Sequence, residues 1–580
     1  MPPLDDGLVV TSAGSDYMID VMRSSLKIDH VVFVPGDTFK GLHESLINYG
    51  MVTDPKMAYS EVNHEEAAVA FCHGYAKVAG KPMACMVHST VGLQHASMAL
   101  YNAWADRVPV FCIVGAMLYG KERGGSVGWE HSVFDGPALV RDFTKWDDTP
   151  LSFEDFAEAA VRAYTFAVTP PGGPVVLAVD EKFQENPIPG GKPPALPQLP
   201  DTTPPAGDPA AVKELAGWLV NARYPLIVAD RAARTPEGLK QMIELAETLQ
   251  AAVVDAQGRF NFPWRHPLNQ TSRQRAAVAD ADVILGLEMT DFSGVIGHVP
   301  ASVKRISISS EELYMKSNYQ DFGPFAHVDL AIAGDAEATL PALIEAIRKL
   351  IPAGRQSAYA ERGKALAEAH INALEASRTA AAFGWDEQPI SVARMCAEIY
   401  AQIHNEDWAL LNGTIFQSYW PQQLWHADKH HQYIGDAGAY GLGYLPGASM
   451  GAATAHAQHG RLAVAIGGDG DLMFSPGVLW AAAHNRIPVL YVVHNNRAYF
   501  NEIMALQRIA NRRSRGVDRT RIGTVLTEPN IDYATVAKGM GMFGIGPITD
   551  PKDLGPALQQ AIAMVKSGEP ALIDVVAQGR

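Results

Sequence analysis

Two short polar segments in the last third of the chain have the residue types best suited to chemistry. Gly468, Asp469 and Gly470 follow one apolar run, and Asn495 and Asn496 follow the next. If both runs are parallel strands, their ends meet at one edge of a sheet, where ligands bind. Glycines allow a phosphate to approach the backbone, and side-chain oxygens of Asp and Asn suit Mg²⁺. Either segment alone is a common turn, but together they predict a site for Mg²⁺ and a diphosphate.

This order of GDG, helix and NN resembles the diphosphate-binding motif of the thiamine-diphosphate-dependent enzymes. The resemblance implies that Asp469 and Asn496 are Mg²⁺ ligands and that the main-chain carbonyl of Ala498 is a third. It also implies that Gly468 and Gly470 bind the cofactor. The expected cofactors are therefore thiamine diphosphate and Mg²⁺.

The segment GLGYLPG at 441–447 is similar to the dinucleotide fingerprint GxGxxG. Its third glycine position is Pro446 and no apolar run leads directly into it, so a nucleotide fold is not predicted there. In the thiamine-diphosphate family such a segment passes under the cofactor, which makes Leu442 the candidate for the side chain that bends it. The alternative interpretation is that Leu442 is simply a core residue. The carbonyl of Gly413 matches the family's contact to the 4′-amino group.

A glutamate near the start of the chain matches the second part of the family's machinery. In HEEAAVAFCHGYA, Glu65 occupies the place of the glutamate that bonds the pyrimidine N1′. A glutamate at a helix start is also explained by the helix dipole, but the match continues through Gly74 and Ala76. A zinc-protease pattern HExxH would require histidine where Ala68 stands.

The substrate-side candidates come from four separate segments. Asp37, in VPGD, matches the aspartate of pyruvate-decarboxylase-type enzymes, and His88 resembles the histidine of benzoylformate-decarboxylase-type enzymes. Where the pyruvate-decarboxylase-type enzymes with VPGD have two adjacent histidines, this chain has only His131, preceded by a glutamate. Glu502 matches a glutamate placed over the substrate. His88 could instead be an ordinary strand-end residue, and Glu502 a solvated helix residue.

The elements that must position these residues follow from hydrophobic patterning. Short runs rich in Val and Ile alternate with longer helical patterns, which indicates an α/β fold with parallel sheets. We expect three doubly wound parallel-sheet domains, as in the family. The expected division is a pyrimidine-binding domain (1–186), a Pro-rich linker (187–206), a middle domain (207–355), a helical connector (356–384) and a diphosphate- and Mg-binding domain (385–580).

Composition excludes several classes of protein. The 580 residues are 47% hydrophobic and 19% charged, which is a globular balance. A net charge of −16 disfavours nucleic acid and anionic membrane as partners. No signal-peptide pattern or long apolar run occurs, and the four cysteines form no CxxC pair, as expected for reduced thiols in a cytoplasmic protein.

The resemblance implies cleavage of a C–C bond next to a carbonyl. Non-oxidative decarboxylation of a 2-oxo acid, with possible carboligation, is the first hypothesis, because Asp37, His88 and Glu502 match decarboxylase positions. An acetolactate-synthase-like carboligase is the second, and a silent regulatory relative is the third. The family arrangement implies a homodimer as the smallest active unit and a homotetramer as the usual state. The middle domain shows no convincing flavin pattern. The arginine run from Arg508 to Arg521 is solvated, pairs across an interface or attracts an anionic substrate.

Overall fold

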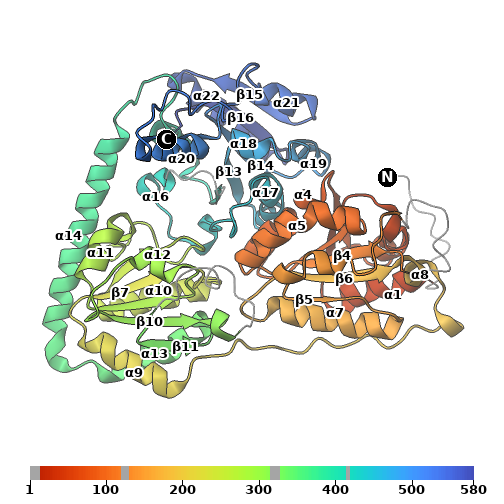
Figure 1. Cartoon of the computed structure of the whole chain (residues 1–580), viewed down its shortest axis with the longest axis horizontal. Helices are drawn as coiled ribbons and strands as arrows, with labels where there is room; N and C mark the ends of the chain where they lie inside the picture. The colour runs from red at the N-terminus through yellow and green to blue at the C-terminus, as the bar shows by residue number, and fades with distance from the viewer. Residues whose placement is uncertain (1–12, 119–129, 314–326, 413–418, 580) are drawn as a thin grey trace. The chain divides into compact units, whose positions relative to one another are not determined.

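The computed structural model describes residues 13–118, 130–313, 327–412 and 419–579. Within these residues the strands form three sheets, and every strand pair in them is parallel (Figure 1). Helices lie between successive strands along the chain. The predicted fold class, three doubly wound parallel-sheet α/β domains, is confirmed.

The first sheet has the order β2-β1-β3-β4-β6-β5. Its strands are β1 (His30–Phe33), β2 (Ala58–Glu61), β3 (Ala84–Val87), β4 (Phe111–Ala116), β5 (Trp146–Asp148) and β6 (Val175–Asp180). Its helices are α1 (Gly14–Asp20), α2 (Lys40–Ser45), α3 (Met51–Thr53), α4 (Glu65–Ala79), α5 (Thr90–Ala105), α7 (Phe153–Val168) and α8 (Glu181–Glu185). The central strands β3, β4 and β6 are buried along their whole length, as expected for strands covered on both faces.

The second sheet has the order β11-β10-β9-β7-β8. Its strands are β7 (Pro225–Ala229), β8 (Ala252–Asp255), β9 (Val283–Leu287), β10 (Lys304–Ser309) and β11 (Leu330–Ala333). The accompanying helices are α9 (Pro209–Asn221), α10 (Pro236–Leu249), α11 (Gln274–Asp280), α12 (Phe292–Ile296) and α13 (Ala336–Leu350). A long helix, α14 (Gln356–Ala381), follows and runs along this domain (Figure 1).

The third sheet has the order β12-β13-β14-β16-β15. Its strands are β12 (Trp408–Asn412), β13 (Leu462–Gly468), β14 (Val489–Asn495), β15 (Phe543–Ile548) and β16 (Ala571–Val576). The helices are α15 (Val392–Ile403), α16 (Trp420–Leu424), α17 (Tyr444–Ala457), α18 (Asp469–Leu472), α19 (Val478–His484), α20 (Phe500–Arg512), α21 (Tyr533–Gly539) and α22 (Pro551–Lys566).

Contacts divide the chain into two compact units. The first contains the first sheet together with Ala437–Ala455 and Ser475–Asn485, and the second contains the second and third sheets. Helices α17 and α19 therefore pack with the first domain, although they lie in the sequence of the third. A Cβ on Gly74 of α4 would overlap the carbonyl oxygen of Ala448 of α17, so this packing needs glycine at that position.

Two further observations concern the cysteines and the helices. Cys72, Cys85, Cys112 and Cys396 are all free and buried. No helix in the described part of the chain is both long and apolar enough to cross a membrane.

The close approach of α4 and α17 predicts the effect of one methyl group. Gly74→Ala should destabilise the first unit by about 1–3 kcal/mol, because the backbone of α17 must move away. Gly217→Ala is the control: Gly217 lies in α9 with open space around its would-be Cβ, so alanine should be neutral or stabilise the helix by up to about 1 kcal/mol. Melting temperatures measured by calorimetry test the pair, and identical melting of both variants and wild type would contradict the packing.

Candidate functional site

The candidate residues of the first unit follow the carboxyl ends of three neighbouring strands. Asp37 follows β1, Glu65 follows β2 and His88 follows β3, and the sheet order places β1 between the other two. In a parallel sheet these three ends lie on the same edge, where the loops leave room for a ligand. The sheet therefore gathers residues that are up to 51 positions apart in the sequence.

Glu65 is the first residue of α4 and is only 7% exposed. His64 caps this helix, since its Nδ1 accepts a hydrogen bond from the Glu66 N–H at 3.2 Å. His95 Nδ1 lies 3.1 Å from Glu65 Oε2, whereas Oε1 accepts no hydrogen bond from the described residues. A Cβ on Gly92 would lie 2.9 Å from that Oε1, so glycine leaves space beside it. Glu65 thus keeps one carboxylate oxygen available for a ligand.

His88 forms a pair with His131. Their nitrogens, Nε2 of His88 and Nδ1 of His131, lie 3.4 Å apart, and the two rings meet edge to face at 4.8 Å. On the other side of the ring, His88 Nδ1 lies 3.1 Å from the Thr38 hydroxyl. Burial, and next the neighbouring His131, lower the pKa of His88, while the carboxylates of Glu65 and Asp37 oppose this shift. The two histidines of this pair therefore come from different segments of the chain and meet only in the folded structure.

Asp37 is more exposed than these residues. Its carboxylate lies 3.5 Å from Lys40 Nζ, which is closer to Glu181 at 2.7 Å. Asp37 begins a short 3-10 helix that ends at Phe39 and that also carries Thr38, the hydroxyl partner of His88. The exposed carboxylate is thus tied to the histidine pair through its own loop.

The candidate residues of the second unit follow the carboxyl ends of β13 and β14, which are neighbours in the third sheet. Gly468 ends β13, and α18 begins at Asp469 itself and spans only four residues. A Cβ on Gly470 would lie 2.5 Å from the Tyr499 ring, so the tight turn requires glycine there. The predicted strand, turn and strand are present, but the following helical region is divided into α18 and α19.

Asp469 is buried and has an incomplete set of hydrogen bonds. It is 1% exposed, and its Oδ1 accepts a hydrogen bond from the Gly470 N–H at 2.9 Å. Its Oδ2 is buried and has no hydrogen-bond partner among the described residues. Burial raises the pKa of Asp469 to about 7, although hydrogen bonds from backbone groups oppose this shift. A buried carboxylate oxygen without a partner is stabilised by a cation or by a hydrogen-bond donor.

Asn496 and Ala498 lie at the end of the neighbouring strand. Asn496 Oδ1 accepts a hydrogen bond from the Ala498 N–H at 2.9 Å, which fixes the turn after β14. The preceding Asn495 is anchored by its Nδ2, which donates to Asp574 Oδ1 at 2.8 Å. The expected donor set of one carboxylate, one amide oxygen and one carbonyl is of the hard-oxygen type that Mg²⁺ prefers. The unpartnered oxygen of Asp469 fits this set.

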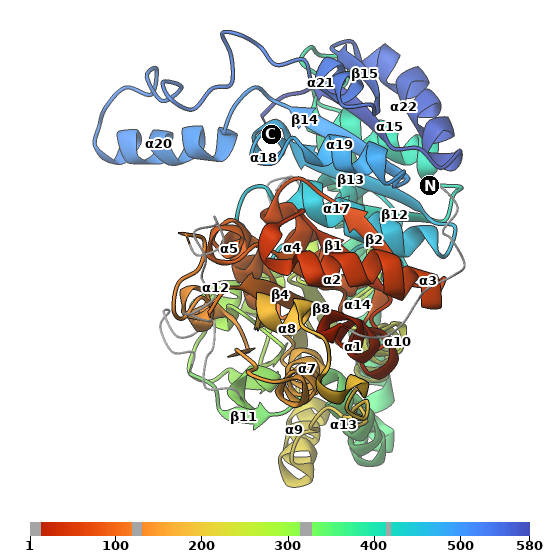
Figure 2. The same cartoon turned by 90° about the vertical axis from the view of Figure 1, so that its right-hand side faces the viewer.

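Other predicted residues have less defined surroundings. Gly413 lies outside the described residues. Leu442 is partly exposed just before α17, and the preceding Gly441 is held by Asn102, whose Oδ1 accepts from the Gly441 N–H at 3.0 Å. Glu502 lies in the first turn of α20, where it is exposed. Figure 2 shows α20 standing away from the third sheet, and of its residues only Ile503 is buried.

The arginine run after Glu502 is exposed. Among the described residues it forms no ion pair, and its six arginines are Arg508, Arg512, Arg513, Arg515, Arg519 and Arg521. Within this single chain the run is therefore solvated, and its other two interpretations stay predictions.

Sequence reasoning missed several residues that hold the candidate site residues of the first unit in place. Thr38, Asn102 and His95 belong to no motif, and they act through neighbours that are distant in the sequence. The described residues also contain no cluster of three or more His, Cys, Asp or Glu side chains suited to a metal ion. The ligand set expected for Mg²⁺ contains only one such side chain, Asp469, so the absence of these clusters does not test it.

Comparisons with known proteins agree across the chain. Residues 12–137 match the family model of the N-terminal TPP binding domain of thiamine pyrophosphate enzymes, residues 212–343 that of the central domain, and residues 416–575 that of the C-terminal TPP binding domain. The chain is 26% identical to benzoylformate decarboxylase of Pseudomonas aeruginosa, covering 89% of this chain and 91% of that protein. It is 22% identical to a probable acetolactate synthase large subunit of Methanocaldococcus jannaschii, covering 91% and 87%.

Solved structures share the fold. A thiamine diphosphate-dependent 4-hydroxybenzoylformate decarboxylase of Rhodococcus jostii superposes with a TM-score of 0.75 at 20% identity, covering 98% of this chain and 99% of that one. Benzoylformate decarboxylase of Polynucleobacter necessarius superposes with a TM-score of 0.77 at 19% identity, with the same coverage. These similarities extend over all three sheets.

Proposed function

Because this chain belongs to the thiamine pyrophosphate enzymes, we propose that it is a thiamine-diphosphate- and Mg²⁺-dependent carbon–carbon lyase that decarboxylates a 2-oxo acid without oxidation. Some carboligation accompanies this reaction. The observation that carries the proposal is the buried, unpartnered carboxylate oxygen of Asp469 at the strand edge that also presents Asn496. The domain boundaries given above stay part of the proposal, and each of the three family matches falls within one proposed domain.

In this proposal the two strand edges divide the work. Asp469, Asn496 and the carbonyl of Ala498 hold Mg²⁺, and Gly468 and Gly470 allow the diphosphate to approach. Gly413 and Leu442 orient the cofactor's pyrimidine ring. Bound thiamine diphosphate supplies a carbon nucleophile that also accepts the electrons released when the substrate's C–C bond breaks.

The first unit supplies the proton chemistry. Glu65, with its available Oε1, holds a proton at the pyrimidine N1′. The His88–His131 pair exchanges protons with the substrate, because an imidazole can accept and donate protons near neutral pH. Asp37 and Glu502 act on the reacting carbon and on the departing product.

An acetolactate-synthase-like carboligase is the second candidate. It is supported by the relative from Methanocaldococcus jannaschii, which matches nearly the full chain at an identity close to that of the decarboxylase relative. For either activity we propose a small 2-oxo acid or related carbonyl substrate and a cytoplasmic location. A homodimer is the smallest active unit in this proposal, with a homotetramer as the usual state.

The first test concerns the metal site. In metal-free protein, Asp469→Asn should leave the melting temperature unchanged or raise it, because it removes a buried carboxylate that lacks a full set of partners. Thiamine diphosphate with Mg²⁺ should raise the melting temperature of wild type and not that of the variant. Asp280→Asn, at an exposed aspartate, is the control and should respond like wild type. Equal stabilisation of all three proteins would remove Asp469 from the site.

The second test concerns Glu65→Gln, which keeps the shape but cannot exchange a proton. Turnover of 2-oxo acids should fall by about 10² or more, while thiamine diphosphate should still bind. Glu44→Gln, on the exposed side of α2, should retain wild-type turnover. Steady-state release of CO₂ measures turnover, and calorimetric titration measures binding; a fully active Glu65→Gln enzyme is incompatible with the proposed role.

The third test separates decarboxylation from carboligation. If Glu502 helps to deliver the proton that releases an aldehyde, Glu502→Gln should lower aldehyde release more than CO₂ release. An added acceptor aldehyde should then raise the ratio of hydroxyketone to free aldehyde, as measured by chromatography. Asp518→Asn, another exposed carboxylate after α20, is the control. An unchanged ratio at wild-type rates would favour the carboligase and return Glu502 to a solvated helix residue.

A further inference from the structure

A cavity of about 440 Å³ is lined by residues of the second unit. Its lining residues come from the end of β8 and the segment after it, and from four helices, α11, α12, α14 and α16. Figure 1 labels these four helices. Its lining residues include Asp255, Gln257, Trp264, Arg265, Val295, His370, Leu374 and Gln422. The volume is within the usual range for a small-molecule site.

Arg265 is the charged group of this cavity without a counter-ion. Its Nη1 donates to the carbonyls of Trp264 at 3.3 Å and Gln422 at 3.0 Å, and no carboxylate among the described residues pairs with it. Burial lowers its pKa to about 10; Tyr400 opposes this shift and Arg378 adds to it. A partly buried guanidinium with free N–H groups is stabilised by a carboxylate, which it can bind through two hydrogen bonds.

The carboxyl of Asp255, although it lines the same cavity, has other partners. It accepts hydrogen bonds from the Gln257 N–H at 2.7 Å, the Asn261 side-chain amide at 2.8 Å and the Asn261 N–H at 3.1 Å. It therefore holds the turn after β8 and does not neutralise Arg265. The positive charge of the cavity is left for a ligand.

Two buried atoms of the lining are acceptors without donors. His370 is 5% exposed, and its Nδ1 donates to the Asn269 carbonyl at 2.7 Å, which leaves Nε2 of the neutral ring as an acceptor. Neither this Nε2 nor Gln422 Oε1 has a hydrogen-bond partner in the described part of the chain. Trp264, Val295 and Leu374 add an apolar wall. A fitting ligand would bring a negative charge, an apolar body and a hydrogen-bond donor.

We propose that this cavity is a binding site for a small organic carboxylate that carries a hydroxyl or N–H donor. Arg265 binds the carboxylate, the His370 and Gln422 acceptors receive the donor, and the apolar wall contacts the ligand's body. The single guanidinium of Arg265 can neutralise a monoanion, whereas a phosphate dianion would keep one negative charge uncompensated in a partly buried site. None of its lining residues is assigned a role in the proposed reaction, so the inference does not depend on the proposed function.

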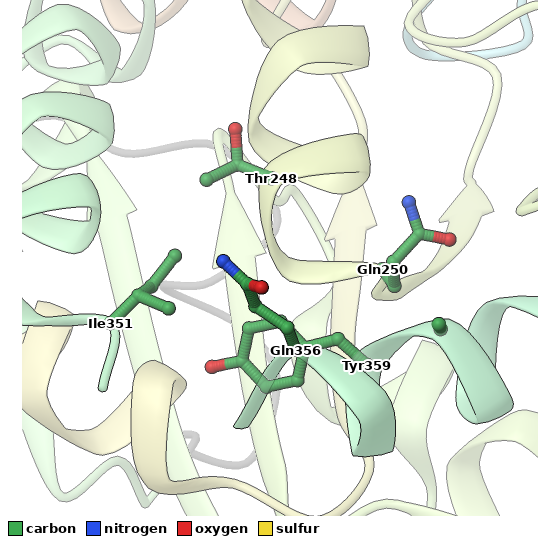
Figure 3. Close-up of a pocket in the computed structure, with 6 residues that line it drawn as sticks. Thr248, Gln250, Ile351, Gln356 and Tyr359 are labelled. Carbon is green, nitrogen blue, oxygen red and sulfur yellow. The ribbon is translucent and has the colours of Figure 1, made fainter. Parts of the chain in front are cut away.

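Another cavity of the same unit makes the contrast clear. It has about 530 Å³ and is lined by Thr248, Gln250, Ile351, Gln356, Tyr359 and Ala360 (Figure 3). These side chains are all uncharged, and the Tyr359 hydroxyl is already engaged, since it donates to the Val220 carbonyl at 2.8 Å. Nothing in this lining selects an anion.

The test uses the full chain with thiamine diphosphate and Mg²⁺ present, and 4-hydroxybenzoate as the probe. Titration calorimetry should show saturable binding that Arg265→Gln weakens about tenfold or more, as expected for loss of a charge-assisted contact. Benzoate, which lacks the donor, should bind more weakly, and His370→Phe should remove that difference. Arg275→Gln, an exposed arginine of α11 outside the cavity, should bind like wild type. Leu374→Trp, which fills the cavity while keeping the charge, should also abolish binding.

Other outcomes would overturn the inference. One is an absence of saturable binding to wild type, and a second is equal binding by wild type, Arg265→Gln and Leu374→Trp. Loss of binding in His88→Ala but not in Arg265→Gln would place the probe at the reaction site instead. Inorganic phosphate that binds more tightly than 4-hydroxybenzoate, with the same Arg265 dependence, would show a phosphate site and contradict the carboxylate assignment. Melting curves of each variant verify folding, and Leu374→Trp keeps the test decisive if Arg265→Gln is unstable.

Discussion

The convergence of parallel strand ends is the constraint on which the rest of this structure depends. In each sheet all strands point the same way, so residues that follow neighbouring strands must meet at one edge. This edge brings Asp37, Glu65 and His88 together in the first domain, and Asp469 and Asn496 in the third. The strands themselves are buried and apolar, so the polar groups lie in the segments that follow the strand ends.

Burial at that edge gives the polar groups their character. Asp469 has one oxygen bonded to its own turn and one without a partner among the described residues, and burial disfavours its ionised form. Glycines are placed where a side chain would block such groups: Gly470 faces the Tyr499 ring and Gly92 faces Glu65. The glycines therefore leave space for a ligand, and the buried carboxylate of Asp469 is stabilised when a ligand supplies a cation.

The middle domain shows two opposite ways of burying an arginine. Arg362 of α14 is satisfied by backbone carbonyls, among them those of Gln250 and Arg223 at 2.9 Å each, and it joins the ends of α9 and α10 to the long helix. Arg265 has only two carbonyl contacts through one nitrogen and borders a cavity. The hydrogen bonds of Arg362 are made within the fold, whereas Arg265 keeps N–H groups that can bind a ligand.

The sequence alone determined the fold class and the strand-end residues, because buried parallel strands read as apolar runs and because GDG, NN and HEEAAVAFCHGYA carry their meaning locally. It did not predict the short edge strand β5, whose three residues are only partly buried and give no apolar run. Only the tertiary structure decided which residues complete each group. The His88–His131 pair, the Thr38 hydroxyl and the hold of Asn102 on Gly441 join segments up to 339 positions apart. No local pattern encodes such contacts, since they arise when separate strands and helices pack.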